Sequence, residues 1–209
     1  MIEIRTWYTF ATDVLGYLNP IYRLALGMTR ETTAKRLQES GKFLICPKDT
    51  RRHQKKIFKS IYHPLYDTID KIVLPNDKFK IQAYGKIAIS FIITPQNDAD
   101  IEFLKALGPF SLWTIDHILN YTKGKNNLQY GVKAGTISIF IIRVFELREE
   151  IVIHRPTGAG ISNQFFNIFI PSSDILKDCK PVIPDEEFDE ILSSIEYIYS
   201  LYSALKKKN

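Results

Sequence analysis

Apolar residues recur every three or four positions along much of this chain, and this spacing predicts amphipathic α-helices. The clearest case predicts a helix over residues 52–73, in which the apolar positions are Ile57, Ile61, Leu65, Ile69 and Ile72. The same spacing predicts further helices over residues 78–93 and 109–123. The pattern therefore predicts a mainly α fold, built as a helical bundle.

Residues typical of helix ends predict two more helices. Asn97–Asp100 has the capped, acidic character of a helix start, and Gly108 with Pro109 closes that short helix. A last helix is predicted from Pro184 to Lys208. Its first turn is acidic and its last turn is basic, so the charges complement the helix dipole at both ends.

Two other apolar stretches, 136–154 and 164–170, are rich in β-branched and aromatic residues, and periodicity alone cannot assign such runs. We assign 136–154 to a buried helix, because the run is long and contains neither glycine nor proline. It also carries Glu146, Glu149 and Glu150 at helical spacing. A short β element is expected around 164–170. An α+β fold is the alternative to the helical bundle.

Composition and charge place the chain among ordinary globular proteins. Its 209 residues are 45% hydrophobic and 24% charged, enough for one domain with a sizeable core. The formal net charge of +5 slightly favours a polyanion partner. The start lacks the plan of a signal peptide, and every apolar run is shorter than the ~20 residues that span a bilayer. We therefore expect a cytoplasmic protein without a membrane partner.

The two cysteines, Cys46 and Cys179, lie far apart and have no spacing typical of metal ligands. We expect two free thiols in a reducing compartment. The four histidines have no such spacing either. The sequence therefore predicts neither a bound metal nor a cofactor.

An arginine precedes a histidine by six positions within the stretch Leu147–Arg155. Metal-free phosphodiester chemistry needs a cation that stabilises phosphate oxygens and a group that moves protons. Arg148 and His154 are candidates for these two roles. On one helix they would lie about 9 Å apart along the axis and leave on different sides, so a compact site would need a second protomer.

This arrangement resembles the Arg-x(4–6)-His signature of the HEPN superfamily, helical proteins that include many RNA-cutting toxins and antiviral effectors. The resemblance implies a HEPN-like bundle over 52–207, with residues 1–50 as an N-terminal helical extension of a single domain that spans 1–209. It also implies a homodimer that cleaves RNA without metal through attack of the 2′-hydroxyl. An antitoxin or regulatory protein would be a further partner.

The same resemblance assigns roles to the residues of the motif. Arg148 would stabilise phosphate and His154 would transfer protons, with Glu149, Arg155 and Arg143 as auxiliary residues. Glu149 departs from the family, which often has Asn, Asp or His after the arginine. This departure puts an accessory role of that position in doubt.

The densest basic run, Lys48–Lys59, falls at the expected start of a helix, where positive charge opposes the dipole. A bound phosphate would relieve that conflict. The candidate RNA-binding residues of this run are Arg51, Arg52, Lys55 and Lys56. The alternative is a solvated surface without a ligand.

Two other hypotheses stand beside the ribonuclease. The first is a non-catalytic helical module that binds RNA, a nucleotide or a protein. The second is an α+β protein in which residues 137–170 form strands and the Arg–His motif is accidental. Each of the three remains open on the sequence alone.

Overall fold

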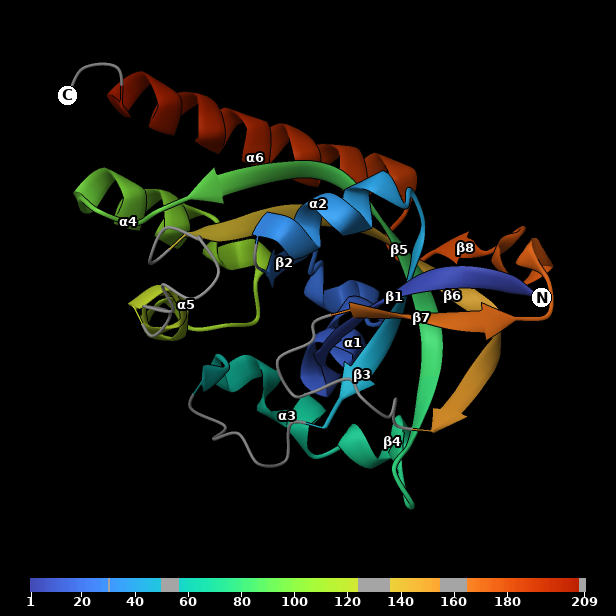
Figure 1. The fold of residues 1–209 in the computed structure, drawn as a ribbon. Helices are drawn as coiled ribbons and strands as arrows, with labels where there is room; N and C mark the ends of the chain where they lie inside the picture. The colour runs from blue at the N-terminus through green and yellow to red at the C-terminus, as the bar shows by residue number, and fades with distance from the viewer. Residues whose placement is uncertain (30, 50–56, 124–135, 155–164, 207–209) are drawn as a thin grey trace.

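The computed structural model describes residues 1–29, 31–49, 57–123, 136–154 and 165–206 (Figure 1). Its strands are β1 (Ile2–Phe10), β2 (Leu26–Thr29), β3 (Phe43–Lys48), β4 (Val73–Leu74), β5 (Lys78–Ile93), β6 (Ile137–His154), β7 (Phe165–Ile170) and β8 (Lys180–Pro181). Its α-helices are α1 (Ala11–Tyr17), α2 (Glu31–Glu39), α3 (His63–Tyr66), α4 (Asp98–Ala106), α5 (Ile115–Lys123) and α6 (Asp185–Lys206). Short 3-10 turns are η1 (Pro20–Tyr22), η3 (Ser60–Tyr62), η4 (Ile69–Lys71), η5 (Gly108–Phe110) and η7 (Ser173–Leu176).

One eight-stranded mixed sheet joins all of these strands. Its order is β2-β6-β5-β3-β1-β7, with β4 beside β5 and β8 beside β6. Strands β1 and β3 run parallel, and the other pairs are antiparallel. The fold is therefore α+β, as the alternative hypothesis had it. The prediction of a mainly α, HEPN-like helical bundle is wrong.

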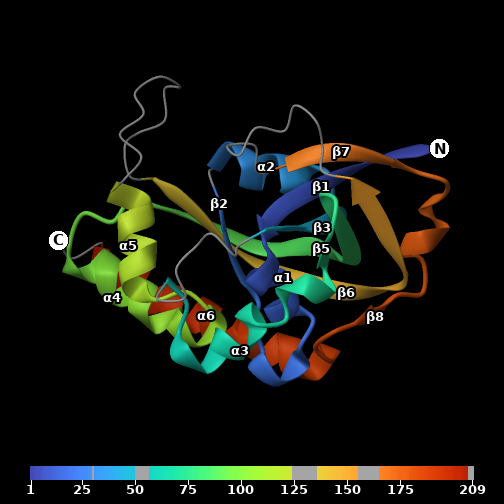
Figure 2. The same cartoon turned by 90° about the horizontal axis from the view of Figure 1, so that it is seen from below.

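Helices cover both faces of this sheet. Figure 2 shows α2 on one side and α4 with α6 on the other. Neighbouring residues of β5 point to opposite faces, as successive strand residues do. The hydroxyl of Ser90 donates to Gln38 of α2 at 3.3 Å, whereas the ring of Phe91 lies 4.5 Å from Tyr199 of α6 and 6.1 Å from Phe103 of α4.

The helices on both faces explain why the sequence pattern of the two longest strands predicts helices instead. The helix predicted over 78–93 is β5, and the helix predicted over 136–154 is β6. The first eight residues of β6 are all buried, because both faces of the strand are covered there. A strand buried on both faces has a continuous apolar run instead of alternation, and β-branched residues favour the extended backbone. The single helix predicted over 52–73 is also wrong, because its described part is divided into the short helix α3, the turns η3 and η4, and the first residue of β4.

Other predicted elements are confirmed. The short β element is β7, and the last helix is α6. Helix α4 begins after Asn97, whose side chain accepts a hydrogen bond from the backbone of Asp100 in a capping box. Helix α5 begins only at Ile115, because η5 precedes it.

Both cysteines are free thiols, and no helix within the described residues is long and apolar enough to span a membrane.

The first fifty residues form part of the sheet rather than helices alone. Strand β1 lies between β3 and β7, and its Trp7 is buried. The Trp7 ring lies 5.1 Å from the ring of Phe140 and 6.3 Å from the rings of Phe43 and Tyr17. The prediction that residues 1–50 form a helical extension is therefore wrong, because they contain β1, β2 and β3. The single domain expected over 1–209 stays a prediction.

Gly27 of β2 allows this aromatic cluster to close. A Cβ at this position would lie 2.5 Å from the Phe140 ring and 3.1 Å from the Trp7 ring. We expect Gly27→Ala to lower the free energy of unfolding by about 1–3 kcal/mol, because neither ring can move without disturbing the core. Urea denaturation measures this change. Gly108→Ala is the matched control, since its Cβ would meet nothing closer than Lys59 at 3.8 Å; an equal effect of both changes would contradict the steric explanation.

Candidate functional site

The two predicted catalytic residues lie on strand β6, and both are exposed. Arg148 forms an ion pair with Asp178 at 3.5 Å, and His154 ends the strand opposite Lys78. Six residues of strand cover up to about 20 Å. Within the described residues, no hydrogen bond or ion pair joins Arg148 to His154. The helical geometry expected for the motif does not apply to this segment.

The auxiliary residues are dispersed. Arg143 is buried, forms an ion pair with Asp185 and lies 4.4 Å over the ring of Phe188, so it fixes the start of α6 to the sheet. Glu149 is exposed on β6. The remaining candidates lie outside the described residues: Arg155, Arg51, Arg52, Lys55 and Lys56.

A pocket of about 410 Å³ opens beside η5, and sequence reasoning did not predict it. Its volume lies within the range of about 300–1,000 Å³ that is typical of small-ligand sites. We call it the Lys59 pocket. It is lined by Lys59, Leu104, Lys105, Gly108, Pro109, Trp113, Ile115 and Ile118. The lining is thus mostly apolar, with two lysines.

The ammonium group of Lys59 is held in place by backbone oxygens. Its Nζ donates to the carbonyl of Gly108 and, at 2.7 Å, to the carbonyl of Ser111. A lysine has three donors, so one remains without a partner among the described residues. No carboxylate of the described residues lies within ion-pair distance of Lys59, and its partial burial lowers the pKa of the ammonium group. Lys59 is therefore a fixed cation in a largely apolar surrounding, with no counter-ion among the residues that the structure describes.

Backbone pairing fixes the position of Lys59. Phe58 forms a β-bridge with Trp113, and the Lys59 amide donates to the Leu112 carbonyl at 2.9 Å. The amide of Thr114 donates back to the Ile57 carbonyl at 3.0 Å. The two segments that form the pocket wall are therefore joined on both sides of Phe58, and Lys59 itself makes one of these hydrogen bonds.

A buried acid holds the Trp113 side of the wall. The indole Nε1 of Trp113 donates to Oδ1 of Asp13 at 2.8 Å, and Thr9 donates to Oδ2 at 2.6 Å. Burial raises the pKa of Asp13 to about 7, although these hydrogen bonds oppose the shift. The orientation of the indole, and with it the shape of the pocket, therefore depends on Asp13.

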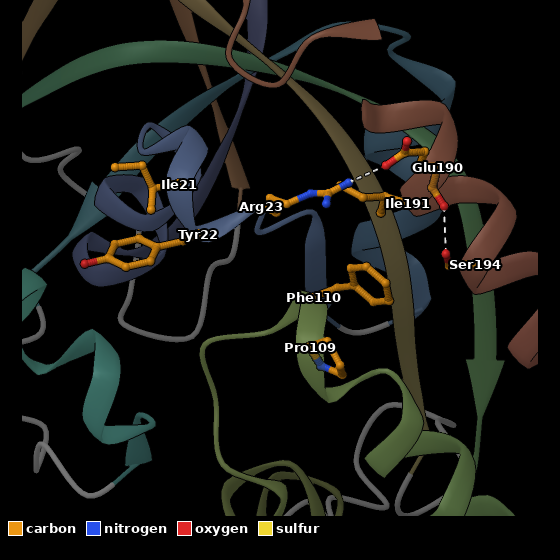
Figure 3. Close-up of a pocket in the computed structure, with 8 residues that line it drawn as sticks. All are labelled: Ile21, Tyr22, Arg23, Pro109, Phe110, Glu190, Ile191 and Ser194. Carbon is orange, nitrogen blue, oxygen red and sulfur yellow. Dashed lines mark hydrogen bonds and ion pairs between the residues drawn. The ribbon is translucent and has the colours of Figure 1, made fainter. Parts of the chain in front are cut away.

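A second pocket, of about 370 Å³, shares Pro109 with the first (Figure 3). In Figure 3, Arg23 points toward Glu190 of α6, and its guanidinium donates to that carboxylate at 3.0 Å. The Nε of Arg23 also lies 3.8 Å from a carboxylate oxygen of Glu187. Because two carboxylates neutralise Arg23, this second pocket does not favour an anion. Of the two pockets, the Lys59 pocket is the one whose cation has no carboxylate partner among the described residues.

No group of three or more His, Cys, Asp or Glu side chains among the described residues is arranged so that it could hold a metal ion. The buried acids Asp13 and Asp100 instead accept hydrogen bonds from protein donors. The Lys59 pocket is therefore the described feature with the clearest binding chemistry.

Comparison with known proteins gives a family match. A family described as a domain of unknown function, DUF1802, matches residues 25–194, a span that contains the whole Lys59 pocket. No curated protein matches the chain. The match, together with the sheet-rich fold, overturns the resemblance to the HEPN superfamily.

Proposed function

Because the chain belongs to the DUF1802 family, whose description states no activity, we propose a function from the chain's own geometry: it is a binding module for an anion with an apolar body. The apolar part of the ligand occupies the Lys59 pocket, and its acidic group accepts the third hydrogen bond of Lys59. The observation that carries this proposal is the fixed Lys59 ammonium, which has no counter-ion among the described residues.

The physical chemistry of the pocket supports this ligand class. Apolar walls favour a ligand body that leaves water, by about 25 cal/mol for each Å² buried. The same walls lower the local dielectric constant, which strengthens the attraction between Lys59 and an acidic group. Lys59 is already ordered by two carbonyl groups, so little side-chain freedom is lost on binding. A carboxylate, sulfonate or phosphate on a ring or alkyl body has the required chemistry.

Binding without catalysis agrees best with the lining of the pocket. Its only titratable side chains are Lys59 and Lys105, and Lys105 forms an ion pair with Glu102 at 2.7 Å. The lining thus offers no paired acid and base for proton transfer. The ribonuclease hypothesis depended on the HEPN resemblance and is not carried forward. The proposed module is non-catalytic, like the alternative to the ribonuclease, but its fold is based on a sheet.

The proposal is tested with 8-anilinonaphthalene-1-sulfonate, an apolar anion that fluoresces when bound. We expect Lys59→Met to weaken its binding by about tenfold or more, since a hydrogen bond to a charged group contributes about 1.5–3 kcal/mol. Fluorescence titration gives the Kd of each variant. Circular dichroism on the same samples establishes that the variant is folded.

The matched control is Lys35→Met, which removes an exposed lysine from α2 on the far side of the sheet. This change should leave the Kd within about twofold, because Lys35 does not line the pocket. If folded Lys59→Met binds the sulfonate as tightly as the unmodified protein, the proposed function is wrong.

A further inference from the structure

A second cationic site lies near the β7 edge of the sheet, where β1, α2 and β7 meet. The guanidinium of Arg5 lies 5.5 Å from the centre of the Phe165 ring, and that of Arg36 lies 5.0 Å from it. We propose that Arg5 and Arg36 together bind a phosphate monoester. This inference is independent of the Lys59 pocket.

The fold brings the three side chains together. Trp7 pairs with Phe165 and Arg5 pairs with Asn167, so Arg5 and Phe165 are diagonal neighbours on one face of the sheet. Arg36 reaches the same ring from the last turn of α2. In addition, Nη1 of Arg5 donates to the backbone carbonyl of Arg36 at 3.4 Å. The two guanidinium groups are thus held close together by elements that are far apart in the sequence.

The two guanidinium charges have no acidic partner in the part of the chain that the structure describes. Among the described residues, no carboxylate forms an ion pair with Arg5 or Arg36. Glu3 lies on the same face of β1, but its carboxylate accepts a hydrogen bond from Asn167 at 2.9 Å. Two like charges near one ring repel each other, and a dianion between them would remove that repulsion. The arrangement therefore favours a ligand group with about two negative charges.

A phosphate monoester has the matching charge and shape. It carries about −1.5 to −2 at neutral pH and presents three acceptor oxygens. A guanidinium presents a planar fork of donors that binds such oxygens in pairs. The Phe165 ring already contacts both cations, so it supports them and is not a free platform for a base. A monoester end therefore fits this site better than a phosphodiester of a nucleic acid strand.

The test uses phenyl phosphate as the probe and the Nε–Hε signals of arginine in nuclear magnetic resonance as the readout. We expect the Arg5 and Arg36 signals to shift and saturate, and Arg36→Gln to weaken the affinity about tenfold. Arg36→Lys should recover only part of the affinity, because it restores the charge without the fork. Phenyl phosphate also has the chemistry proposed for the Lys59 pocket, so the affinity of this site is taken from the Arg5 signal alone. Lys59→Met should leave the saturation curve of that signal unchanged, which separates the two sites.

Lys35→Gln is the matched control, since it removes one exposed charge from the neighbouring position of α2. It should change the affinity by less than about twofold. Dimethyl phosphate at equal ionic strength should bind more weakly than phenyl phosphate. Equal binding by the Arg36→Gln and Lys35→Gln proteins would overturn the proposal, and so would tighter binding of the diester.

Discussion

Replacing Asp100 by alanine is expected to lower the free energy of unfolding by about 3–5 kcal/mol. Asp100 is fully buried at the start of α4, and its carboxylate accepts from Tyr202 at 2.6 Å and forms an ion pair with Lys206 at 2.8 Å. It also accepts from the backbone amides of Gln96 and Asn97. Alanine would leave these donors without their acceptor and would release the end of α6 from α4.

The pKa of Asp100 gives this prediction a dependence on pH. Burial alone would raise that pKa, but the hydrogen bonds from Lys206, Tyr202 and Gln96 outweigh it and lower the pKa below 3.8. The stabilisation is therefore present above pH 3.8 and is lost as the pH falls below it. Urea denaturation at neutral pH measures the main effect. The control is Asp98→Ala, which removes an exposed acid from the same helical turn and should lower the free energy of unfolding by at most about 1 kcal/mol. If Asp100→Ala lowers it by no more than this control, the prediction is wrong.

Asp13 is expected to lower stability as the pH rises, which is the opposite of the effect of Asp100, and Asp13→Asn is expected to remove this loss. The pKa of Asp13 is about 7 in the folded protein against an ordinary value of 3.8. Between these values the unfolded chain releases a proton that the folded protein keeps, so stability falls as the pH rises. The difference of about three pKa units corresponds to about 4 kcal/mol.

Asparagine removes this titration while it keeps an acceptor for the Trp113 indole and a partner for Thr9. The stability of Asp13→Asn relative to the unmodified protein should therefore rise by about 4 kcal/mol between pH 4 and pH 8. Denaturation curves at several pH values measure this difference. Glu31→Gln, an exposed acid of α2, should show no such trend. A difference that stays constant with pH would mean that Asp13 is ionised in the folded protein.

The sequence predicted those elements whose signals are local. Helix α4 has its capping box at Asn97, α6 has opposite charges at its two ends, and β7 is a short run between polar segments. Strands β5 and β6 were mistaken because their pairing is not local. Their apolar residues face α2 on one side and α4 with α6 on the other, and no periodicity separates such a strand from a buried helix.

The Lys59 pocket could not be predicted from the sequence, because its residues make contacts with residues that are far away along the chain. Lys59 belonged to the basic run noted in the sequence, but its partners Gly108 and Ser111 lie about fifty residues later. The sequence also predicted that a helix ends at Gly108 and Pro109, and these residues form the turn η5 beside the pocket. Asp13 and Trp113 are one hundred residues apart, so only the fold brings them together. The Arg148–His154 spacing, by contrast, suggested a helical motif on a segment that is a strand.

In the proposed binding mode, Lys59 recognises the charge of a ligand whose body lies in an apolar pocket. Binding of two probes, 8-anilinonaphthalene-1-sulfonate and the neutral N-phenyl-1-naphthylamine, to the unmodified protein and to Lys59→Met tests this recognition. We expect the substitution to weaken binding of the sulfonate about tenfold, or about 1.4 kcal/mol, and to change binding of the neutral probe by less than about twofold. If the substitution weakens binding of both probes equally, or of neither, Lys59 does not recognise the charge.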